Sequence, residues 1–262
     1  EFLDHNKTLM VLINQHHNFS HPKLITLPRG LPLQTEHSER IIWDTMQSVL
    51  LKQMRKSELA YTSVSSASFR SRILRCIQNN FPGGEFKAIN TSVEDQGVKL
   101  QRVGTLAYRK EYYTNLAAAR VGIALPGIGY DTYRLWEILT MGSMAVIERG
   151  VGLDRTVWRL PVLLVDDFSQ VTPELLRTAY VEAIYRTESG QFEFQRLRQS
   201  YWWSFIMRIS KSKSVADILS VFPMDAEDIE FTRPVEQFSC GVKSGDMTAC
   251  GKGTKRIPIN PC

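Results

Sequence analysis

The stretch from Arg120 to Glu148, RVGIALPGIGYDTYRLWEILTMGSMAVIE, decides the fold of this chain. Val121–Leu125 is a short apolar run typical of a buried strand, and Pro126–Tyr130 breaks the chain with two glycines. Thr132–Met141 then carries apolar residues at helical spacing, and Met144–Ile147 is a second apolar run. The order strand, turn, helix, strand predicts a βαβ unit. In such units ligands bind at the carboxyl end of the strand, beside the start of the helix.

The start of the predicted helix carries charges that favour a binding site. Asp131 stands where an N-cap is expected, and Gly142 stands where the helix should stop. Arg134 would be the third residue, where a cation faces the positive end of the helix dipole at a cost of a few tenths of a kcal/mol, roughly. A bound anion such as phosphate would explain it. The alternative is a surface ion pair with Asp131 and Glu137, worth roughly 0–1 kcal/mol, and spacing alone favours neither.

A family resemblance is carried by the pattern P-G-x-G-x-D-T-x-R-x-W-E-x-L-x-x-G-x-x-x-V at residues 126–146. This pattern resembles the signature of exostosin-like glycosyltransferases, the family of heparan-sulfate polymerases and Golgi xylosyl- and glucuronosyltransferases. The likeness is strong from Leu116 to Val165, although Ala145 replaces the usual proline. The resemblance implies an enzyme that moves a hexosyl or pentosyl group from a nucleoside-diphosphate sugar to a glycan or glycoprotein acceptor.

Strands that alternate with helices along the chain predict an α/β fold with a mainly parallel sheet. Further strands are predicted at residues 8–13, 23–27, 59–64, 86–89 and 162–165, and further helices at 36–54, 70–79, 108–120, 173–185 and 192–209. The resemblance implies the Rossmann-like, C-terminal nucleotide-binding half of a two-domain, GT-B-type glycosyltransferase. Residues 1–34 would then be a remnant of the N-terminal acceptor-side domain, 35–222 the nucleotide-sugar-binding domain and 223–262 an irregular tail with cysteines. The chain is therefore expected to be a fragment of a longer protein.

The resemblance also implies roles for individual residues in a donor site. Arg134 and the backbone amides of the turn before it would hold the diphosphate, while Glu137 would accept bonds from ribose or sugar hydroxyls and Tyr130 would line the base or sugar. A serine-rich turn leads into a second helix, where Arg70 matches the family's arginine best and Arg72 second; a solvated basic face is the alternative. The predicted donor-binding set is Arg70, Gly127, Gly129, Tyr130, Asp131, Thr132, Arg134 and Glu137. No catalytic base is identified.

Composition narrows the classes of partner. The 262 residues are 43% hydrophobic and 23% charged, as in an ordinary globular protein. The net charge of +5 fits a nucleotide or polyanion partner, but the basic residues form no tract, which argues against nucleic acid. The sequence has no apolar run near the ~18 residues of a membrane span, so membrane attachment would need a preceding anchor. No clear D-x-D motif or metal-ligand spacing stands out. Adjacent Asp166–Asp167 are expected to bound a turn, and the alternative is that they hold a ribose or a metal. A divalent ion such as manganese stays an open cofactor.

Two features bear on the compartment. Three glycosylation sequons begin at Asn6, Asn18 and Asn90. Three of the four cysteines, Cys240, Cys250 and Cys262, lie in the last segment, and Cys76 lies far from them. Their spacing matches no zinc-binding pattern. One or two disulfides in a protein of the Golgi or endoplasmic reticulum lumen are expected. The alternative is a cytoplasmic protein with free thiols.

Two other functions compete with the glycosyltransferase. A nicotinamide-dependent oxidoreductase requires G-x-G-x-x-G at the strand–helix turn, and here Gly127 and Gly129 are followed by no third glycine. A non-catalytic nucleotide- or glycan-binding module of the same fold stays open, because a fold alone does not establish an activity.

Overall fold

The computed structural model describes residues 11–14, 24–31, 36–65, 68–91, 106–127, 130–149 and 153–211. These residues divide between two compact units, which we describe separately. Unit 1 contains the described residues within 1–29, 150–158 and 194–261, and unit 2 those within 30–149 and 159–193.

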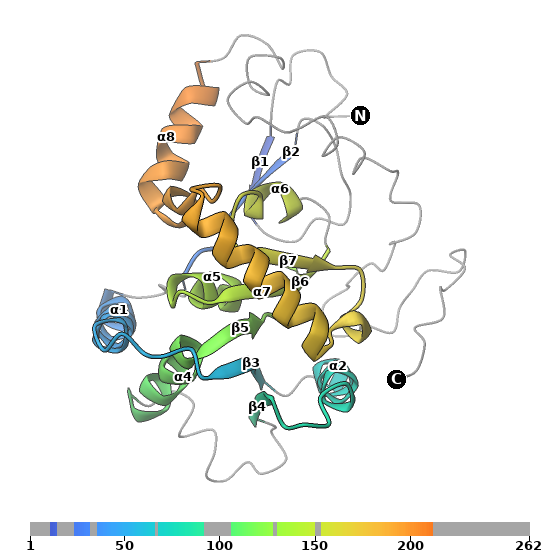
Figure 1. Cartoon of the computed structure of the whole chain (residues 1–262). Coiled ribbons are helices and arrows are strands. Elements are labelled where there is room, and N and C mark those ends of the chain that lie inside the picture. The colour runs from blue at the N-terminus through green and yellow to red at the C-terminus, as the bar shows by residue number, and fades with distance from the viewer. Residues whose placement is uncertain are drawn as a thin grey trace. The chain divides into compact units, whose positions relative to one another are not determined.

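Unit 2 is built on one parallel sheet of five strands, which confirms the α/β prediction (Figure 1). Its strands, in spatial order, are β4 (Phe86–Thr91), β3 (Glu58–Ser65), β5 (Ala119–Ile123), β6 (Met144–Glu148) and β7 (Val162–Val165). The first strand of the sheet in the chain, β3, therefore lies between the second and the third. From β3 the chain moves outward to β4, then returns past β3 and continues in the opposite direction. Such a topological switch point is where open parallel sheets bind ligands, at the carboxyl ends of the strands.

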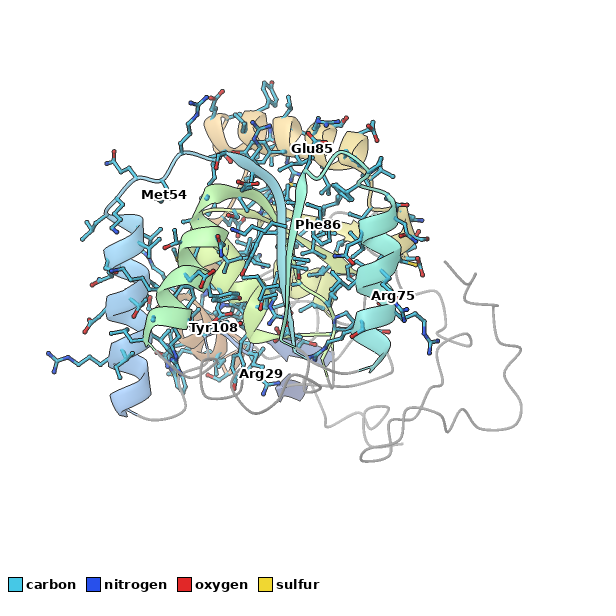
Figure 2. The ribbon with its side chains drawn as sticks, turned by 90° about the horizontal axis from the view of Figure 1, so that it is seen from below. Arg29, Met54, Arg75, Glu85, Phe86 and Tyr108 are labelled. Atoms are coloured by element: carbon cyan, nitrogen blue, oxygen red, sulfur yellow. The ribbon has the colours of Figure 1, made fainter. Side chains whose placement is uncertain are left out.

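Helices cover both faces of this sheet (Figures 1 and 2). One face carries α1 (Glu36–Leu50), α4 (Leu106–Ala118) and α5 (Tyr133–Thr140), and the other carries α2 (Ser68–Asn79), the short 3₁₀ helix η2 (Phe168–Gln170) and α7 (Pro173–Glu188). Figure 2 shows the division directly, with Tyr108 of α4 and Arg75 of α2 on opposite sides of the strands. The middle strands β5 and β6 are consequently buried on both faces, which accounts for their mostly apolar sequences.

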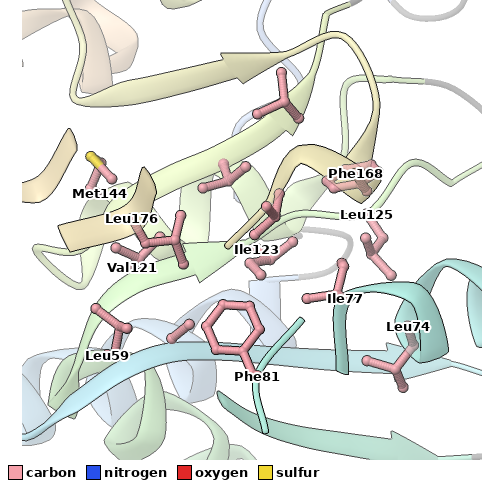
Figure 3. Close-up of a cluster of buried hydrophobic side chains, with 14 of the residues drawn as sticks. Leu59, Leu74, Ile77, Phe81, Val121, Ile123, Leu125, Met144, Phe168 and Leu176 are labelled. Atoms are coloured by element: carbon pink, nitrogen blue, oxygen red, sulfur yellow. The ribbon is translucent and has the colours of Figure 1, made fainter. Parts of the chain in front are cut away.

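The hydrophobic core lies between the sheet and the layer of α2 and α7 (Figure 3). Its buried members are Leu59, Ala60, Leu74, Ile77, Phe81, Val121, Ile123, Leu125, Met144, Val146, Val165, Phe168, Val171, Leu176 and Ala183. Alternate residues of β5, Val121 and Ile123, face this layer, as a strand period of two requires. Fully burying one such side chain stabilises the fold by roughly 1.5–3 kcal/mol. The core thus fixes the sheet whose carboxyl edge carries the candidate site.

The N-terminus of α5 differs from the prediction. The N-cap is Thr132, in an extended conformation and with no side-chain capping bond, so Arg134 is the second residue of the helix rather than the third. The prediction that Asp131 caps the helix is wrong. Asp131 is 4% exposed, and its carboxylate accepts a 2.7 Å hydrogen bond from the indole nitrogen of Trp136. The Asp131 carboxylate thus binds the Trp136 side chain, and Thr132 stands at the N-cap instead.

The C-terminus of α5 ends as predicted at Gly142. This glycine has φ +72°, a left-handed conformation that side chains disfavour. Its amide donates to the carbonyl of Leu139, and the next amide, of Ser143, donates to that of Ile138, each at 3.1 Å. These two bonds form a Schellman motif, which satisfies the last carbonyls of the helix.

The start of α7 is confirmed as well. The Thr172 hydroxyl accepts a 3.2 Å bond from the amide of Leu175, and Pro173 occupies the first turn. The helix runs to Glu188, one turn beyond the predicted end. Strand β4 likewise extends two residues past its predicted end, through Asn90 to Thr91.

The prediction of one helix over residues 192–209 is wrong. In unit 1 this stretch forms a 3₁₀ helix, η3 (Phe194–Leu197), and a separate helix, α8 (Gln199–Ile209). Arg198 between them is extended, with φ −94° and ψ 136°. The Trp202 indole donates a 2.7 Å bond to the Arg196 carbonyl, which occupies an acceptor that a continuous helix would use for its own ladder.

The rest of unit 1 contains a parallel strand pair, β1 (Val11–Asn14) and β2 (Leu24–Leu27), and a short helix, α6 (Leu153–Val157). The sequence did not predict α6. The Thr156 hydroxyl of α6 donates a 2.8 Å hydrogen bond to the Thr26 carbonyl of β2. Within the described residues no helix is long and apolar enough to cross a membrane.

Cys76 of α2 is disulfide-bonded. The other three cysteines, at 240, 250 and 262, and the sequons at Asn6 and Asn18 lie outside the described residues.

Candidate functional site

A cavity of about 270 Å³ opens beside the N-terminus of α5, at the carboxyl edge of the sheet. It is lined by Arg70, Leu125, Thr132, Tyr133, Arg134 and Glu137. Arg70 lies in the first turn of α2, the helix that follows β3, and the other residues follow β5. These strands are the neighbours between which the chain reverses, so the cavity lies at the topological switch point. Four residues of the predicted donor set meet there.

Arg70 is anchored at the cavity by the backbone. Its Nε donates a 2.8 Å hydrogen bond to the Pro126 carbonyl, just beyond β5. Burial lowers the pKa of Arg70, and the nearby positive charge of Arg134 lowers it further. Both side chains line the same cavity, so two like charges share it.

Arg134 is stabilised as a cation by its surroundings. Burial acts to lower the pKa of Arg134, but the Tyr112 hydroxyl and Glu137 carboxylate outweigh burial, and the net pKa is raised. Its Nε is buried and has no hydrogen-bond partner among the described residues, and neither has the Thr132 hydroxyl. Buried polar groups are rarely left unpaired in native proteins. Both groups flank the start of α5, which is the positive end of the helix dipole.

Glu137 is held by hydrogen bonds from two buried tyrosines of α4. The residue is only 8% exposed. Oε2 accepts a 2.8 Å bond from the Tyr112 hydroxyl, and Oε1 accepts a 2.9 Å bond from the Tyr113 hydroxyl. Burial raises the pKa of Glu137, while the two tyrosines and Arg134 act in the opposite direction. Because Asp131 and Glu137 are both buried, the alternative of a surface ion pair at these residues is wrong.

Tyr112 and Tyr113 belong to the site although the sequence did not place them there. Both lie on α4, with ring centroids 5.1 Å apart. The spacing of Tyr112 and Leu116 identified a helix that leads into the central strand, but nothing in it named a polar partner. That partner, Glu137, is more than twenty positions further along the chain. Only the packing of α4 and α5 on the same face brings the hydroxyls to the carboxylate.

The other described members of the predicted set, Gly127, Tyr130 and Asp131, are not among the residues that line the cavity. Gly127 is half-buried in the turn after β5, and Gly129 lies outside the described residues. Tyr130 is half-buried, and burial together with Glu148 raises its pKa. Asp131 is bound to Trp136 as described above.

A second group of polar residues lies at the carboxyl ends of β6 and β7. Glu148 is half-buried, and burial followed by the charge of Asp167 raises its pKa to about 7. Asp167 accepts a 2.6 Å bond from the amide of Ser169, and Asp166 pairs with Arg149 at 3.1 Å. The two aspartates therefore bound a turn, as predicted. The described part of the chain holds no group of three His, Cys, Asp or Glu residues that could bind a metal ion.

No protein-family model matches this chain, and no curated protein is significantly similar to it in sequence.

Proposed function

We propose that this protein is a glycosyltransferase that binds the diphosphate of a nucleoside-diphosphate sugar in the cavity between Arg70 and Arg134. One observation supports this above the others. Two arginines, each in the first turn of a helix that follows a separate strand, line the same cavity at the switch point. A ligand with more than one negative charge would be attracted by both cations and would offset the repulsion between them.

The groups around the cavity match the chemistry of a phosphate ligand. Planar guanidinium groups bind phosphate through two parallel hydrogen bonds. The positive dipole end at the start of α5 favours an anion at the same place. The unpaired Thr132 hydroxyl and Arg134 Nε supply two further donors near the helix start.

Glycosyl transfer would draw on the same charges. The bond between the anomeric carbon and the diphosphate oxygen breaks with its electron pair on the diphosphate, and an acceptor hydroxyl forms the new bond. Fixed cations that meet the growing charge on the leaving group lower the barrier. The acceptor hydroxyl must lose its proton to a general base. Among the described residues that line this cavity, Glu137 is the one with a carboxylate, and it is already bonded to two tyrosines, so we assign the base to no residue.

The size of the cavity suits part of the donor. Its volume of about 270 Å³ is slightly below the roughly 300–1,000 Å³ of typical small-molecule sites. The diphosphate and part of the nucleoside would occupy it, with the sugar directed outward. The resemblance to exostosin-like enzymes extends the proposal to a glycan or glycoprotein acceptor, to a Golgi or endoplasmic reticulum location, and to membrane attachment through a preceding anchor.

Thermal denaturation with nucleotides tests the proposal. Uridine, guanosine and cytidine diphosphates are added with and without manganese, and the melting temperature is measured for the wild type, Arg134→Met, Arg70→Met and Arg72→Met. Arg72 is exposed and near Arg70 in the sequence, so it is the matched control. At a hundred times the dissociation constant a ligand adds about 2.7 kcal/mol to the free energy of unfolding.

The expected result is stabilisation by one nucleotide in the wild type and in Arg72→Met, with the effect lost in the other two variants. Each lost bond to a charged phosphate would weaken binding by about tenfold or more. A cooperative melt that no nucleotide shifts would overturn the proposal. Dependence on manganese in the same screen would identify the metal as part of the donor complex.

The alternative is a non-catalytic nucleotide-binding module, and the engagement of Glu137 by two tyrosines favours it. Such a protein would show the same stabilisation by nucleotide. It would differ in leaving a bound nucleoside-diphosphate sugar intact, neither transferring nor hydrolysing it. Release of free nucleoside diphosphate from a panel of donor sugars separates the two functions.

A further inference from the structure

Helix α7, which covers one face of the sheet, carries large apolar side chains on its outer side (Figure 1). Leu176 and Ala183 of this helix are buried in the hydrophobic core. On the other side of the helix, Val181 and Tyr185 are each 66% exposed and Ile184 is 41% exposed. The spacing i, i+3, i+4 places these three side chains next to one another on one helix face. Single exposed apolar residues need no explanation, but a group of them is typical of a contact surface.

A residue of opposite charge stands at each end of this apolar group. Arg177, Val181, Ile184 and Glu188 are separated by four, three and four positions. At 3.6 residues per turn, all four fall within an arc of about 60° and form one line along the helix. We call these four residues the α7 stripe. Its charges are accessible, because Glu188 is exposed and the Arg177 side chain is 44% exposed.

The basic end of the α7 stripe is held in place by the surrounding residues. Arg177 pairs with Glu85 of the loop before β4 and with Glu174 one turn earlier in α7. These two carboxylates contact different terminal nitrogens of the guanidinium, so they fix its position at the end of the stripe. A guanidinium has five N–H donors, and two such contacts leave it able to bind a further carboxylate.

The α7 stripe is complementary to itself when it is reversed. If a second copy of the helix is laid antiparallel across the midpoint of the stripe, Val181 of one copy faces Ile184 of the other, and Arg177 faces Glu188. Tyr185 then covers Val181 of the second copy. A twofold axis requires this property, because the same patch on both copies must contact itself. The equal outer spacings and the opposite end charges together meet the requirement.

The position of Glu188 favours the same arrangement. Glu188 is the last residue of α7, where the negative end of the helix dipole disfavours a carboxylate. In an antiparallel pair this carboxylate lies beside the N-terminal half of the other helix and next to its Arg177. A second copy therefore offsets a charge placement that is unfavourable in the single helix.

We propose that the α7 stripe is the contact between two copies of this chain, which pack with their α7 helices antiparallel about a twofold axis. The apolar centre excludes water, and the two Arg177–Glu188 pairs at its ends fix the register. This inference does not depend on the proposed function. The contact of two 16-residue helices is small beside the roughly 1,200–2,000 Å² of stable interfaces, so the association is weak and depends on concentration.

Sedimentation equilibrium of the full chain over a wide range of concentrations measures the association. Val181→Asp places a charge at the apolar centre and should weaken the dimer by about tenfold or more. Leu51→Asp is the matched control, because Leu51 is 83% exposed but lies beyond the end of α1, outside the stripe. It should leave the association constant within about twofold of the wild-type value.

A second pair of variants tests the register and separates it from a loss of folding. Glu188→Lys would place a cation opposite Arg177 of the second copy, so it should weaken the dimer, and high salt should reduce its difference from the wild type. It should not lower the urea unfolding midpoint, because the helix dipole favours a cation in the last turn. Glu182→Lys makes the same charge change at an exposed position of α7 that is not on the stripe, and it should leave the dimer intact.

Three results would overturn the proposal. A wild-type chain that stays monomeric at every concentration would show that this surface does not bind a second copy. Equal weakening by Glu188→Lys and Glu182→Lys would show that net charge, and not the stripe, controls the association. A dimer that Val181→Asp leaves unchanged would form through another face of the molecule.

Discussion

A Cβ atom placed on Gly122 of β5 would lie 2.5 Å from Cγ1 of Ile138 in α5. The same atom would lie 2.7 Å from two further carbons of that side chain. No real contact is that short, so the central strand and the helix that starts the candidate site approach through the missing side chain of one glycine.

Gly122→Ala should therefore destabilise unit 2. Ile138 is fully buried and has little room to move, and overpacking a core typically costs about 1–3 kcal/mol. Urea denaturation measures the change in the free energy of unfolding. Gly83→Ala is the control, because a Cβ atom there would meet nothing within 4 Å. Equal stability of the two variants would show that α5 can shift away from β5 at no cost.

Replacing Asp131 tests the contact that displaced the predicted helix cap. Asp131→Ala would leave the buried Trp136 indole without its acceptor, which costs about 1–3 kcal/mol of unfolding free energy. Asp131→Asn retains an oxygen in the same place and should cost less. Chemical denaturation of both variants decides the point. If asparagine is as destabilising as alanine, the negative charge of Asp131 matters more than its bond to the indole.

The buried carboxylate of Glu148 makes stability depend on pH in the acid range. Its folded pKa is raised from 4.5 to about 7, so between these values the folded state binds more protons than the unfolded state. The free energy of unfolding should fall as the pH rises through this window. Glu148→Gln removes the effect, so the free energy of unfolding of the variant should rise relative to that of the wild type as the pH increases from 4.5 to 7. Glu182→Gln, at an exposed carboxylate of α7, is the matched control. A difference between Glu148→Gln and the wild type that stays constant with pH would contradict the prediction.

Lys56 should have an effect of the opposite sign in the alkaline range. Burial lowers its pKa from 10.5 to about 8, and its Nζ donates a 2.8 Å bond to the neutral hydroxyl of Ser143. Between these pH values the unfolded chain holds the proton and the folded chain releases it. The free energy of unfolding should consequently rise with pH there, relative to Lys56→Met. Lys52→Met at an exposed site is the control. Thermal melts from pH 7 to pH 10 provide the measurement, and a wild type that loses stability relative to Lys56→Met would refute it.

The sequence predicted most of the fold because local signals and packing agree there. Apolar runs identified the strands, and Gly142 and Thr172 marked helix ends through local backbone chemistry. The prediction failed where a side chain five or six positions away forms a hydrogen bond that the sequence pattern does not reveal. Asp131 has the residue type of an N-cap, yet the Trp136 indole bonds to it, and the helix expected across Arg198 is interrupted where another indole bonds to a backbone carbonyl.

The charged residues of the candidate site were predictable from the sequence, but the residues that hold Glu137 in place were not. Arg70 and Arg134 follow strands at expected positions, and their meeting follows from parallel strands sharing one carboxyl edge. The tyrosines behind Glu137 could not be found in this way. Hydroxyl and carboxylate meet only through the packing of two helices that the sequence does not place side by side.

The two arginines that line the cavity belong to helices on opposite faces of the sheet. Arg70 lies in the first turn of α2 on one face, and Arg134 lies in the first turn of α5 on the other. A dianion bound by both arginines would connect the two helices across the edge of the sheet. Opening either helix would then require releasing the ligand. Amide hydrogen exchange should accordingly slow in α2 and α5 together when the site fills, although the two helices cover opposite faces.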